Sequence, residues 1–473
     1  MSQPPILFVD LDNTLTRSDL FLEPLLRLLR KDPMVIFLLP LWLIHGRGYF
    51  KQQLSDRISL DVAELPYDEE VLEFISQQRK SGRKIVLATA SNQVFADQVA
   101  SYLGLFDGVI GSSLDLNTKG KNKLAAMKRY AGDQAFDYLG DSHADLHIWK
   151  EIKRAYVVSP QMGVLQRLQK KAIPVELIHP APASEVYLKA IRPWQWLKNS
   201  LIFVPLILAK QLFDPGSLVA CIMAFISFSL VASAGYLVND LLDLEADRQH
   251  PRKKNRPVAA GLLSLWNIVF LIFVLILTGL LLASLVSINL VLLLVAYFVV
   301  VVAYSLELKQ HALVDVILIA SFYATRIIAG GLAIGVSISF WLLAFSIFVF
   351  LSLALLKRCT EIRSISRDEN TLIPGRGYYQ EDEPMLSVMG ISSGYLSVVV
   401  IALYINSSEV TTLYQSPQFL WLVCPLMLYW ISRMWLKTRR NEMDDDPLVF
   451  ALRDKVSLIT GVLLALVLLL ATL

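Results

Sequence analysis

The sequence predicts two structural classes in one chain: an α/β doubly wound domain with a helical cap, and then an all-α transmembrane domain of nine helices. Between residues 1 and 177, short apolar stretches that end in Asp or Thr alternate with helical patterns. From about residue 197 onward, apolar stretches of nearly 20 residues recur, which is long enough to cross a bilayer. The hydrophobic fraction of 55% and the mean hydropathy of +0.52 are also too high for a soluble enzyme of 473 residues.

Three predicted buried strands organise the N-terminal domain. The stretches 6–9, 85–87 and 138–139 are apolar, and helical patterns at 69–80 and 94–103 lie between them. Strands buried on both faces and separated by helices form parallel sheets, and open α/β sheets bind ligands at the carboxyl ends of their strands. The side chains expected at that edge are Asp10, Asp12, Thr89, Asp141 and Asp145, with Lys123 in the polar stretch between them.

These side chains fit the transfer of a phosphoryl group to a carboxylate. Asp10 is the candidate nucleophile, and Asp12 is the candidate acid and base. Mg²⁺ would be held by Asp10, Asp141 and the backbone carbonyl of Asp12, with Asp145 supporting that shell. Thr89 and Lys123 are expected to hold the phosphate oxygens. Ser91 and Lys121 are the alternatives to Thr89 and Lys123.

The motifs DLDNT (residues 10–14) and GDSHAD (residues 140–145), with Thr89 and Lys123 between them, stand in the order of the four motifs of the haloacid-dehalogenase-like phosphatases. Residues 4–160 therefore resemble that superfamily. The resemblance implies a Mg²⁺-dependent phosphatase domain at residues 1–177, with a helical cap at about residues 17–65. A degenerate domain without activity is the alternative.

The expected cap contains the apolar stretch MVIFLLPLWLI at residues 34–44. Its 11 residues are too few to span a bilayer. The favoured interpretation is that this stretch is the buried core of the cap. The other interpretation is a patch that touches the membrane or a lipid substrate.

A linker and an interfacial helix are predicted at residues 178–196, before the membrane domain at 197–473. Residues 178–184 (IHPAPAS) are rich in Pro and Ala. Trp194 and Trp196 lie beside Arg192 and Lys198, which is typical of a helix at the headgroup level. Lys198 and Asn199 are also candidates for the mouth of an active site.

Nine apolar segments are predicted at about 199–213, 217–238, 264–284, 287–306, 312–334, 339–357, 386–405, 417–436 and 454–472. Lys and Arg concentrate in alternate loops, as Arg248, Arg252, Lys253, Lys254, Arg256, Lys309, Lys357, Arg358, Arg363, Arg367, Arg376, Lys437, Arg439, Arg440, Arg453 and Lys455. By the positive-inside rule these loops face the cytoplasm together with the N-terminal domain. No cleavable signal is expected, because no basic stretch precedes an apolar one at the start. The sequence therefore predicts a multi-pass protein of the inner membrane.

The loop after the second segment begins with NDLLDLEAD, at residues 239–247. At a helix end, the spacing of three and four residues places three of its side chains on one face. Carboxylate and amide oxygens suit Mg²⁺ that carries a phosphate ester, and the basic run that follows suits the phosphate itself. The candidate ligands are Asn239, Asp240, Asp243 and Asp247, with Arg256 as a candidate phosphate-binding residue. A solvated loop is the alternative.

A second polar group lies around the fourth to sixth segments, in Tyr304, Lys309, Asp315, Arg326, Lys357 and Arg358. Charged side chains are costly when they face lipid, so these are expected to face a cavity. The alternative is an Asp315–Arg326 pair that only holds helices together.

Residues 186–473 resemble the UbiA-type intramembrane prenyltransferases, on the motif NDLLDLEAD and the number of segments. The stretches RPWQWLKN, ADRQHPRKKNRPVAAG, YSLELKQHALVD and RIIAGG look most like the decaprenyl-phosphate phosphoribosyltransferase branch. A second Asp-rich motif, expected of aromatic prenyltransferases, is absent, because Asp315 has no Asp four residues on.

The resemblance implies a transfer of 5-phosphoribose from phosphoribosyl pyrophosphate to a polyprenyl phosphate. Asp315 would be catalytic, the four oxygen ligands would hold Mg²⁺, and the N-terminal domain would dephosphorylate the product. The residues expected to bind the substrates are Lys198, Asn199, Arg256, Tyr304, Lys309, Arg326, Lys357 and Arg358.

Two other functions fit the same sequence: an aromatic prenyltransferase that uses polyprenyl diphosphate, and a transporter or lipid-binding membrane protein with a regulatory domain. Transporters often show paired repeats with broken helices, which this sequence lacks. The net charge of +3 gives no reason to expect a nucleic-acid partner. The three cysteines are far apart and indicate neither a zinc site nor a disulfide framework. A homo-oligomer is compatible with the sequence.

Overall fold

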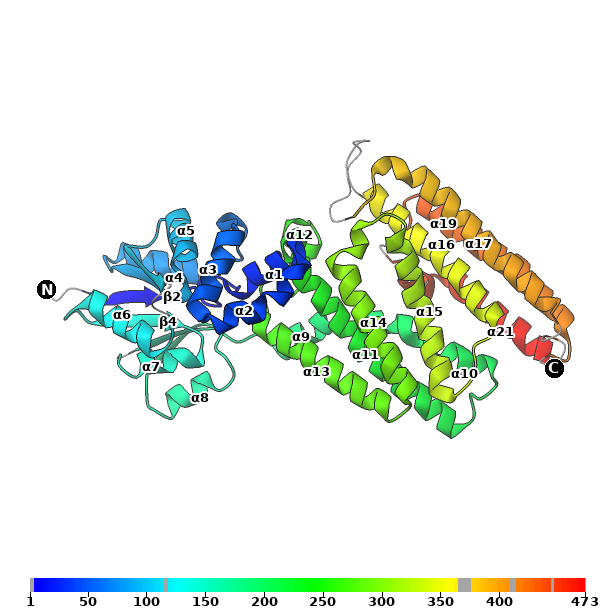
Figure 1. Cartoon of the computed structure of the whole chain (residues 1–473), viewed down its shortest axis with the longest axis horizontal. Coiled ribbons are helices and arrows are strands. Elements are labelled where there is room, and N and C mark those ends of the chain that lie inside the picture. Colours follow the sequence, from blue (N-terminus) through cyan, green and yellow to red (C-terminus); the bar gives the residue numbers. More distant parts are fainter. Residues whose placement is uncertain are drawn as a thin grey trace. The chain divides into compact units, whose positions relative to one another are not determined.

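The computed structural model describes residues 4–113, 118–152, 154–364, 376–407, 410, 414–443 and 446–472 (Figure 1). The chain divides into two compact units, and neither is continuous in sequence. The first unit comprises Met1–Ile191 and Leu237–Ile272, and the second comprises Arg192–Tyr236 and Phe273–Leu473. The loop between the first two membrane helices therefore belongs to the same unit as the N-terminal domain.

The first unit is built on a parallel sheet of six strands with the order β3-β2-β1-β4-β5-β6. The strands are β1 (Ile6–Val9), β2 (Ile85–Asn92), β3 (Gly108–Ser112), β4 (Phe136–Gly140), β5 (Ala155–Val158) and β6 (Val175–His179). The chain runs outward from β1 to β3 and then returns to the other side of β1 with β4. Such a reversal opens a crevice at the carboxyl ends of the two central strands. The prediction of a doubly wound α/β domain is confirmed.

Helices cover both faces of this sheet because the side chains of each strand alternate between them (Figure 1). Leu7 and Val9 of β1 face one core, and Ile6 and Phe8 face the other. The first core contains side chains of α4 (Glu69–Lys80) and α5 (Gln93–Leu103). The second contains side chains of α6 (Lys121–Ala131), α7 (Leu146–Trp149) and α8 (Val164–Gln169).

The cap follows β1 and is helical, as predicted. Its elements are α1 (Leu22–Lys31), η1 (Pro33–Phe37), α2 (Leu39–Ile44), α3 (Arg47–Arg57) and η2 (Val62–Glu64), where η marks a 3₁₀ helix. The interpretation of residues 34–44 as buried cap core is wrong. Of this stretch only Val35 and Trp42 are buried, in a small core with Phe50 and Leu54, and most of its other large apolar side chains are exposed. Because only Val35 and Trp42 of this short stretch point into the core of the cap, most of the other apolar side chains of its two helices face outward.

Eight helices among the described residues are long and apolar enough to cross a membrane, by length and composition. They are α11 (Pro215–Leu242), α13 (Leu265–Ser284), α14 (Ile288–Leu306), α15 (Val314–Ile334), α16 (Phe340–Ser364), α17 (Glu383–Ile405, preceded by η7, Gln380–Asp382), α19 (Val423–Arg439, preceded by η8, Pro417–Leu422) and α21 (Lys455–Thr472). The protein is therefore an integral, multi-pass membrane protein. Arg367, counted above among the loop cations, lies outside the described residues.

The predicted first segment, 199–213, is not one of these spans. The interfacial helix begins as α9 (Ser184–Ile191) but stops at Arg192, which has a φ of +54° and precedes a proline. The chain continues as η4 (Pro193–Phe203) and the five-residue helix α10 (Val204–Leu208). A Cβ added at Gly330 of α15 would lie 2.0 Å from the carbonyl oxygen of Ile202, so this segment packs closely against a true span. The hydropathy of residues 199–213 reflects their apolar composition, but it does not reveal where the helix is interrupted.

The remaining short elements are η3 (His143–Asp145), α12 (Leu244–Gln249), η5 (Lys253–Asn255), η6 (Leu308–Gln310) and α20 (Pro447–Arg453).

Candidate active sites

The predicted phosphatase residues come together at the carboxyl edge of the sheet. Asp10 follows β1, Asp141 follows β4, and Asp145 ends η3. One oxygen from each of these three buried carboxylates lies within 4.8 Å of the others. No other such group of His, Cys, Asp or Glu is found in the part of the chain that the structure describes.

Asp10 is held by a lysine and a tyrosine. The amine of Lys123 donates to Asp10 Oδ2 at 2.8 Å, and the hydroxyl of Tyr138 lies 3.0 Å from the same oxygen. Tyr138 also donates to Asp145 Oδ1 at 2.8 Å. Lys121 is exposed, so the geometry favours Lys123 as the phosphate lysine. Tyr138 was missed by the sequence reasoning, although a hydroxyl in the middle of a buried strand was the available signal.

Asp12 is held by the start of the cap and by β2. Its Oδ1 accepts from the backbone N–H of Leu20 at 2.7 Å, and its Oδ2 accepts from Ser91 Oγ at 2.5 Å and Thr89 Oγ1 at 3.4 Å. The chain turns at Asn13, whose φ of +55° is an angle that Asn tolerates better than most residues. Ser91 is therefore the closer of the two hydroxyls to Asp12.

Burial is the largest cause of the shifted pKa values of the aspartates at this edge, and the charges of neighbouring groups are the next largest. Burial, reinforced by the nearby charge of Asp19, raises the pKa of Asp12 to about 7. That value suits a group that gives up a proton and takes one back near neutral pH. Burial and the Asp145 carboxylate raise the pKa of Asp10, against the opposing effect of Lys123.

A divalent cation fits this set of donors. Burial, with Asp145 and Asp10 nearby, raises the pKa of Asp141 well above its usual range. Clustered carboxylates of this kind repel each other unless a cation lies among them. All three donors are carboxylate oxygens, which Mg²⁺ prefers. Asp10, Asp141 and Asp145 are thus the residues that would hold the ion or its coordinated water.

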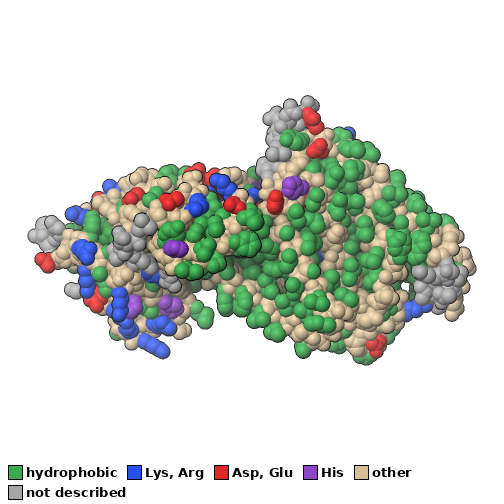
Figure 2. Space-filling model, in the orientation of Figure 1, with side chains coloured by type: hydrophobic (Ala, Val, Ile, Leu, Met, Phe, Trp, Pro, Cys, Tyr) green, Lys and Arg blue, Asp and Glu red, His purple; other side chains and the backbone are tan. Residues whose placement is uncertain are grey.

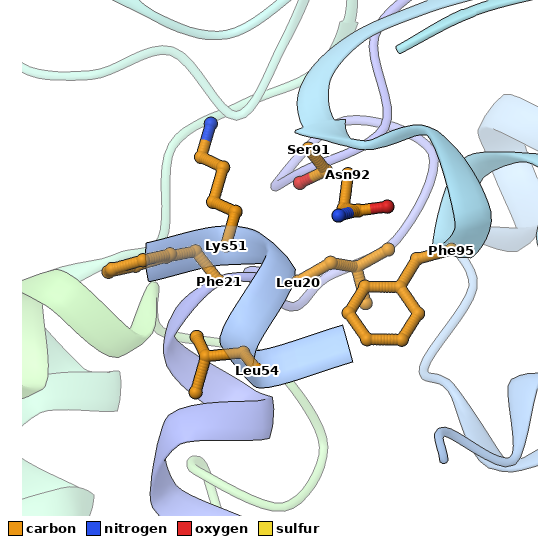
Figure 3. A pocket seen from close by; sticks show the side chains of 7 residues that line it. All are labelled: Leu20, Phe21, Lys51, Leu54, Ser91, Asn92 and Phe95. Atoms are coloured by element: carbon orange, nitrogen blue, oxygen red, sulfur yellow. The ribbon is translucent and has the colours of Figure 1, made fainter. Parts of the chain in front are cut away.

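A pocket opens beside this edge, between the cap and the sheet (Figure 3). Its apolar lining comes from Leu20, Phe21, Leu54 and Phe95, and its polar lining comes from Lys51, Ser91 and Asn92. The amine of Lys51, on α3, donates to the carbonyl oxygen of Ala90 at 2.5 Å. The group attached to a phosphate at Asp10 would therefore meet both an apolar wall and a cation.

The Asp-rich motif lies at the end of α11 and in α12. Asp240 and Asp247 are buried, and both accept from one nitrogen of Arg256, at 3.2 and 2.5 Å. Arg256 was expected to bind substrate phosphate, but here it bridges two candidate ligands. Two carboxylates already arranged around one positive nitrogen, with oxygen donors only, fit a Mg²⁺ ion. The motif is thus compatible with Mg²⁺. Its four side chains converge less closely on one point than the carboxylates of Asp10, Asp141 and Asp145 do.

The motif is also tied to the cap, within the same unit. Arg30 of α1 pairs with Asp243 at 3.4 Å, and Arg27 pairs with Glu245 at 3.5 Å. Arg248 contacts the buried Glu23 at 2.8 Å, and its own side chain is 9% exposed. Burial alone would raise the pKa of Glu23, but Arg248, with smaller contributions from Ser18 and Arg27, lowers that pKa overall. These pairs could not be predicted from the sequence, because their partners lie more than 200 residues apart.

Replacing Glu23 with Gln is expected to destabilise the protein by about 3 kcal/mol at pH 7, because Arg248 loses a buried partner. A carboxyl with a lowered folded-state pKa stabilises the fold above its unfolded-state pKa, near 4.3, and loses that effect as the pH falls through the folded value. The deficit in melting temperature should therefore be large at pH 7 and shrink below about pH 4. Glu70→Gln, at an exposed position, is the control; equal melting temperatures for both variants at pH 7 would contradict the role of this pair.

In the second unit, Asp315 lies at the centre of a buried ion-pair network. It contacts Arg358 at 2.6 Å, Arg376 at 3.2 Å and the hydroxyl of Tyr304 at 2.7 Å. Arg358 also pairs with Glu361. Asp315 does not pair with Arg326, so the alternative of a simple pair between these two is wrong. Arg376 and Glu361 were not predicted as members of the site, because each lies in a stretch with several charged residues, which is typical of a solvent-exposed loop.

The other predicted cations of the second unit form two further groups. Arg326 donates to the amide oxygen of Asn199 at 2.7 Å and lies over the rings of Phe228 and Tyr323. Lys198 contacts Asp446, and Lys357 lies 3.7 Å from the same carboxylate. Lys309 is buried in η6. The sequence analysis did not single out Asp446, which is the last of three consecutive aspartates, residues 444–446.

The comparisons with known families agree with both halves. Residues 200–471 match the model of the UbiA prenyltransferase family, and residues 7–150 match that of haloacid dehalogenase-like hydrolases. The chain belongs to the UbiA prenyltransferase family and carries a haloacid dehalogenase-like domain at its N-terminal end. It is therefore an enzyme of the prenyltransferase superfamily with a hydrolase-like domain.

Three relatives show how far the likeness extends. The protein y4nM of Sinorhizobium fredii, described as uncharacterized, is 38% identical over 97% of this chain and 89% of its own length. The nodulation protein NoeC of Azorhizobium caulinodans is 35% identical over 58% of this chain and 89% of its own length. The decaprenyl-phosphate phosphoribosyltransferase of Mycobacterium tuberculosis is 40% identical over 38% of this chain and 61% of its own length.

Proposed function

We propose that the membrane half transfers 5-phosphoribose from phosphoribosyl pyrophosphate to a polyprenyl phosphate, and that the N-terminal domain then removes the 5-phosphate. The 40% identity to a decaprenyl-phosphate phosphoribosyltransferase over 183 residues supports the first step. The gathering of nucleophile, acid and phosphate lysine at one sheet edge supports the second.

The observation that carries the transferase proposal is the number of buried cations in the second unit. Lys198, Lys309, Arg326 and Arg358 are all buried, and Lys357 is half-buried. Buried charge is costly and is commonly retained for anionic substrates. A sugar phosphate donor and a lipid phosphate acceptor together bring far more negative charge than an aromatic acceptor does. The aromatic prenyltransferase is therefore the weaker proposal.

In the transfer, an oxygen of the lipid phosphate attacks the anomeric carbon of the donor, and the bond from that carbon to pyrophosphate breaks. No protein nucleophile is needed. Lys198, Lys309, Arg326 and Lys357 neutralise the charges of donor and acceptor, while Asp315 keeps Arg358 and Arg376 in position. Asn239, Asp240, Asp243 and Asp247 would hold Mg²⁺, which when bound neutralises the leaving pyrophosphate.

In the hydrolysis, a carboxylate oxygen of Asp10 attacks phosphorus, and the bond from phosphorus to the ribose 5-oxygen breaks. Asp12 gives its proton to that oxygen and then accepts a proton from the water that cleaves the aspartyl phosphate. Lys123 and Ser91 or Thr89 bind the phosphate oxygens. The products are inorganic phosphate and lipid-linked ribose. Because the lipid-linked ribose has lost its 5-phosphate, it cannot be converted back to phosphoribosyl pyrophosphate, and the transfer becomes effectively irreversible.

In this proposal the N-terminal domain lies on the cytoplasmic side of the inner membrane, which the concentration of Lys and Arg in alternate loops supports by the positive-inside rule. Phosphoribosyl pyrophosphate and Mg²⁺ are then supplied from the same compartment to both halves.

The test uses detergent-purified full-length protein, Mg²⁺, a polyprenyl phosphate and phosphoribosyl pyrophosphate labelled in the ribose. Label is expected to enter the lipid fraction only when the polyprenyl phosphate is present. If no label enters the lipid, while a polyprenyl diphosphate reacts with an aromatic acceptor, the phosphoribosyl proposal is wrong.

A further inference from the structure

The cap of the N-terminal domain carries an exposed apolar surface. We define the cap apolar surface as Met34, Ile36, Phe37, Leu38, Leu41, Leu43 and Ile44. Each of these side chains is between 41% and 79% exposed. Contiguous apolar patches of this kind on a folded domain mark a site of interaction. Figure 2 shows hydrophobic side chains gathered over this part of the first unit.

The local structure holds these side chains outward. Val35 and Trp42 point into the small core of the cap, and they fix the orientation of η1 and α2. No charged residue occurs from Pro33 to Ile44. The surface is therefore an uninterrupted apolar segment of two short helices, presented by two buried anchors rather than folded into a core.

Aromatic contacts tie this surface to the membrane boundary. Trp266, in the first turn of the span α13, stacks on Phe21 of the cap with ring planes 10° apart, and its indole N–H donates to Asp19 at 2.9 Å. Phe21 contacts Phe50, and Phe50 contacts Trp42 on α2. Tryptophan at the end of a span marks the headgroup level. The rings thus connect the cap apolar surface to the level where α13 enters the bilayer.

The charge of the helices that carry and flank this surface suits an anionic lipid surface. From Leu22 to Arg57, the range of α1 to α3, there are six Lys and Arg and three Asp and Glu, whereas over the whole cap, residues 17–65, there are seven and six. Amphipathic segments with apolar side chains and surrounding cations lie in the interface of anionic bilayers. A second copy of the chain would have to offer a matching apolar face together with acidic groups.

We propose that the cap apolar surface is inserted in the headgroup region of the bilayer that holds the chain's own spans. The phosphatase pocket shares Phe21 and Leu54 with the cap, so its apolar wall continues toward the lipid. If the proposed function holds, a lipid-linked phosphomonoester reaches Asp10 without leaving the membrane. The insertion itself does not depend on that function.

The test measures the depth of spin labels in the full-length protein, reconstituted in vesicles of neutral and anionic phospholipids. Single cysteines replace Phe37 or Ile44, and Met162→Cys, at a position 97% exposed in the same unit, is the control. The unsubstituted chain gives the background from its own cysteines. Labels at 37 and 44 are expected to collide with membrane-soluble oxygen at least several-fold more often, relative to a water-soluble nickel chelate, than the label at 162. Adding Leu41→Glu and Leu43→Glu to Ile44→Cys should abolish this preference.

Two outcomes would overturn the proposal. Labels at 37 and 44 that are as accessible to the nickel chelate as the label at 162 would show a water-exposed surface. Labels shielded from both reagents would show that protein, such as a second copy of the chain, covers it. Neither readout requires turnover, so a failure of insertion is distinguished from a failure of the proposed function.

Discussion

Replacing Asp10 with Asn is expected to lower the release of the 5-phosphate by at least about 10³-fold, because the amide cannot attack phosphorus. Transfer of phosphoribose to lipid should continue, so the lipid-linked product accumulates with its phosphate in place. The measurement follows ³²P at the 5-position of phosphoribosyl pyrophosphate: it should appear in the lipid fraction with the variant and as inorganic phosphate with the wild type.

The matched control is Lys121→Ala, which removes an exposed lysine two residues from Lys123. It should release phosphate at nearly the wild-type rate, whereas Lys123→Ala should not. Wild-type release of phosphate by Asp10→Asn would show that the domain does not work through this nucleophile. Phosphorylated product from the wild type itself would show that the domain does not act on it.

Replacing Asp243 with Asn is expected to lower phosphoribosyl transfer by about 100-fold and to raise the Mg²⁺ concentration needed for half-maximal rate by about 10- to 100-fold. The substitution removes one negative oxygen from the proposed metal site and leaves the size of the side chain unchanged. Initial rates of label entry into lipid, measured over a range of Mg²⁺ concentrations, report both effects.

Glu245→Gln is the control for this substitution, since it removes a half-exposed carboxylate two residues away that pairs only loosely, at 3.5 Å, with Arg27. Its transfer rate should stay within about two-fold of wild type. Equal losses in the two variants would point to disturbed packing of the cap against the motif rather than to metal binding. Hydrolysis of a water-soluble phosphomonoester by both variants checks that the N-terminal domain is still folded.

The sequence reveals those features that depend on local pattern. Asp10 and Asp141 could be predicted to meet because each directly follows a buried parallel strand, and the topology of such sheets gathers strand ends at one edge. For the eight spans, most of the predicted ends lie within a few residues of the ends in the structure. A bilayer requires a continuous apolar segment of a certain length, and that length can be read from the sequence. In both cases the physical constraint acts on contiguous residues.

Features that depend on direction or on distant partners could not be predicted. Residues 34–44 are apolar, but composition does not say which way each side chain faces. Residues 199–213 are also apolar, yet Arg192, Pro193 and Pro205 break the chain into short pieces. Asp446 became a partner of Lys198 and Lys357 only through a fold that joins residues about 90 to 250 positions apart.

The pairing of Glu23 with Arg248 also sets an order of events during synthesis. Arg248 leaves the ribosome 225 residues after Glu23, which corresponds to roughly 10 to 45 s at ordinary rates of translation. During that interval the sheet and most of its helices have all their residues, but the buried carboxylate of the cap has only Arg27, and not yet Arg248, as a cationic partner. The nascent N-terminal domain is therefore completed only after the first span and the loop behind it have been made. A fragment that ends at the linker would preserve that unfinished state.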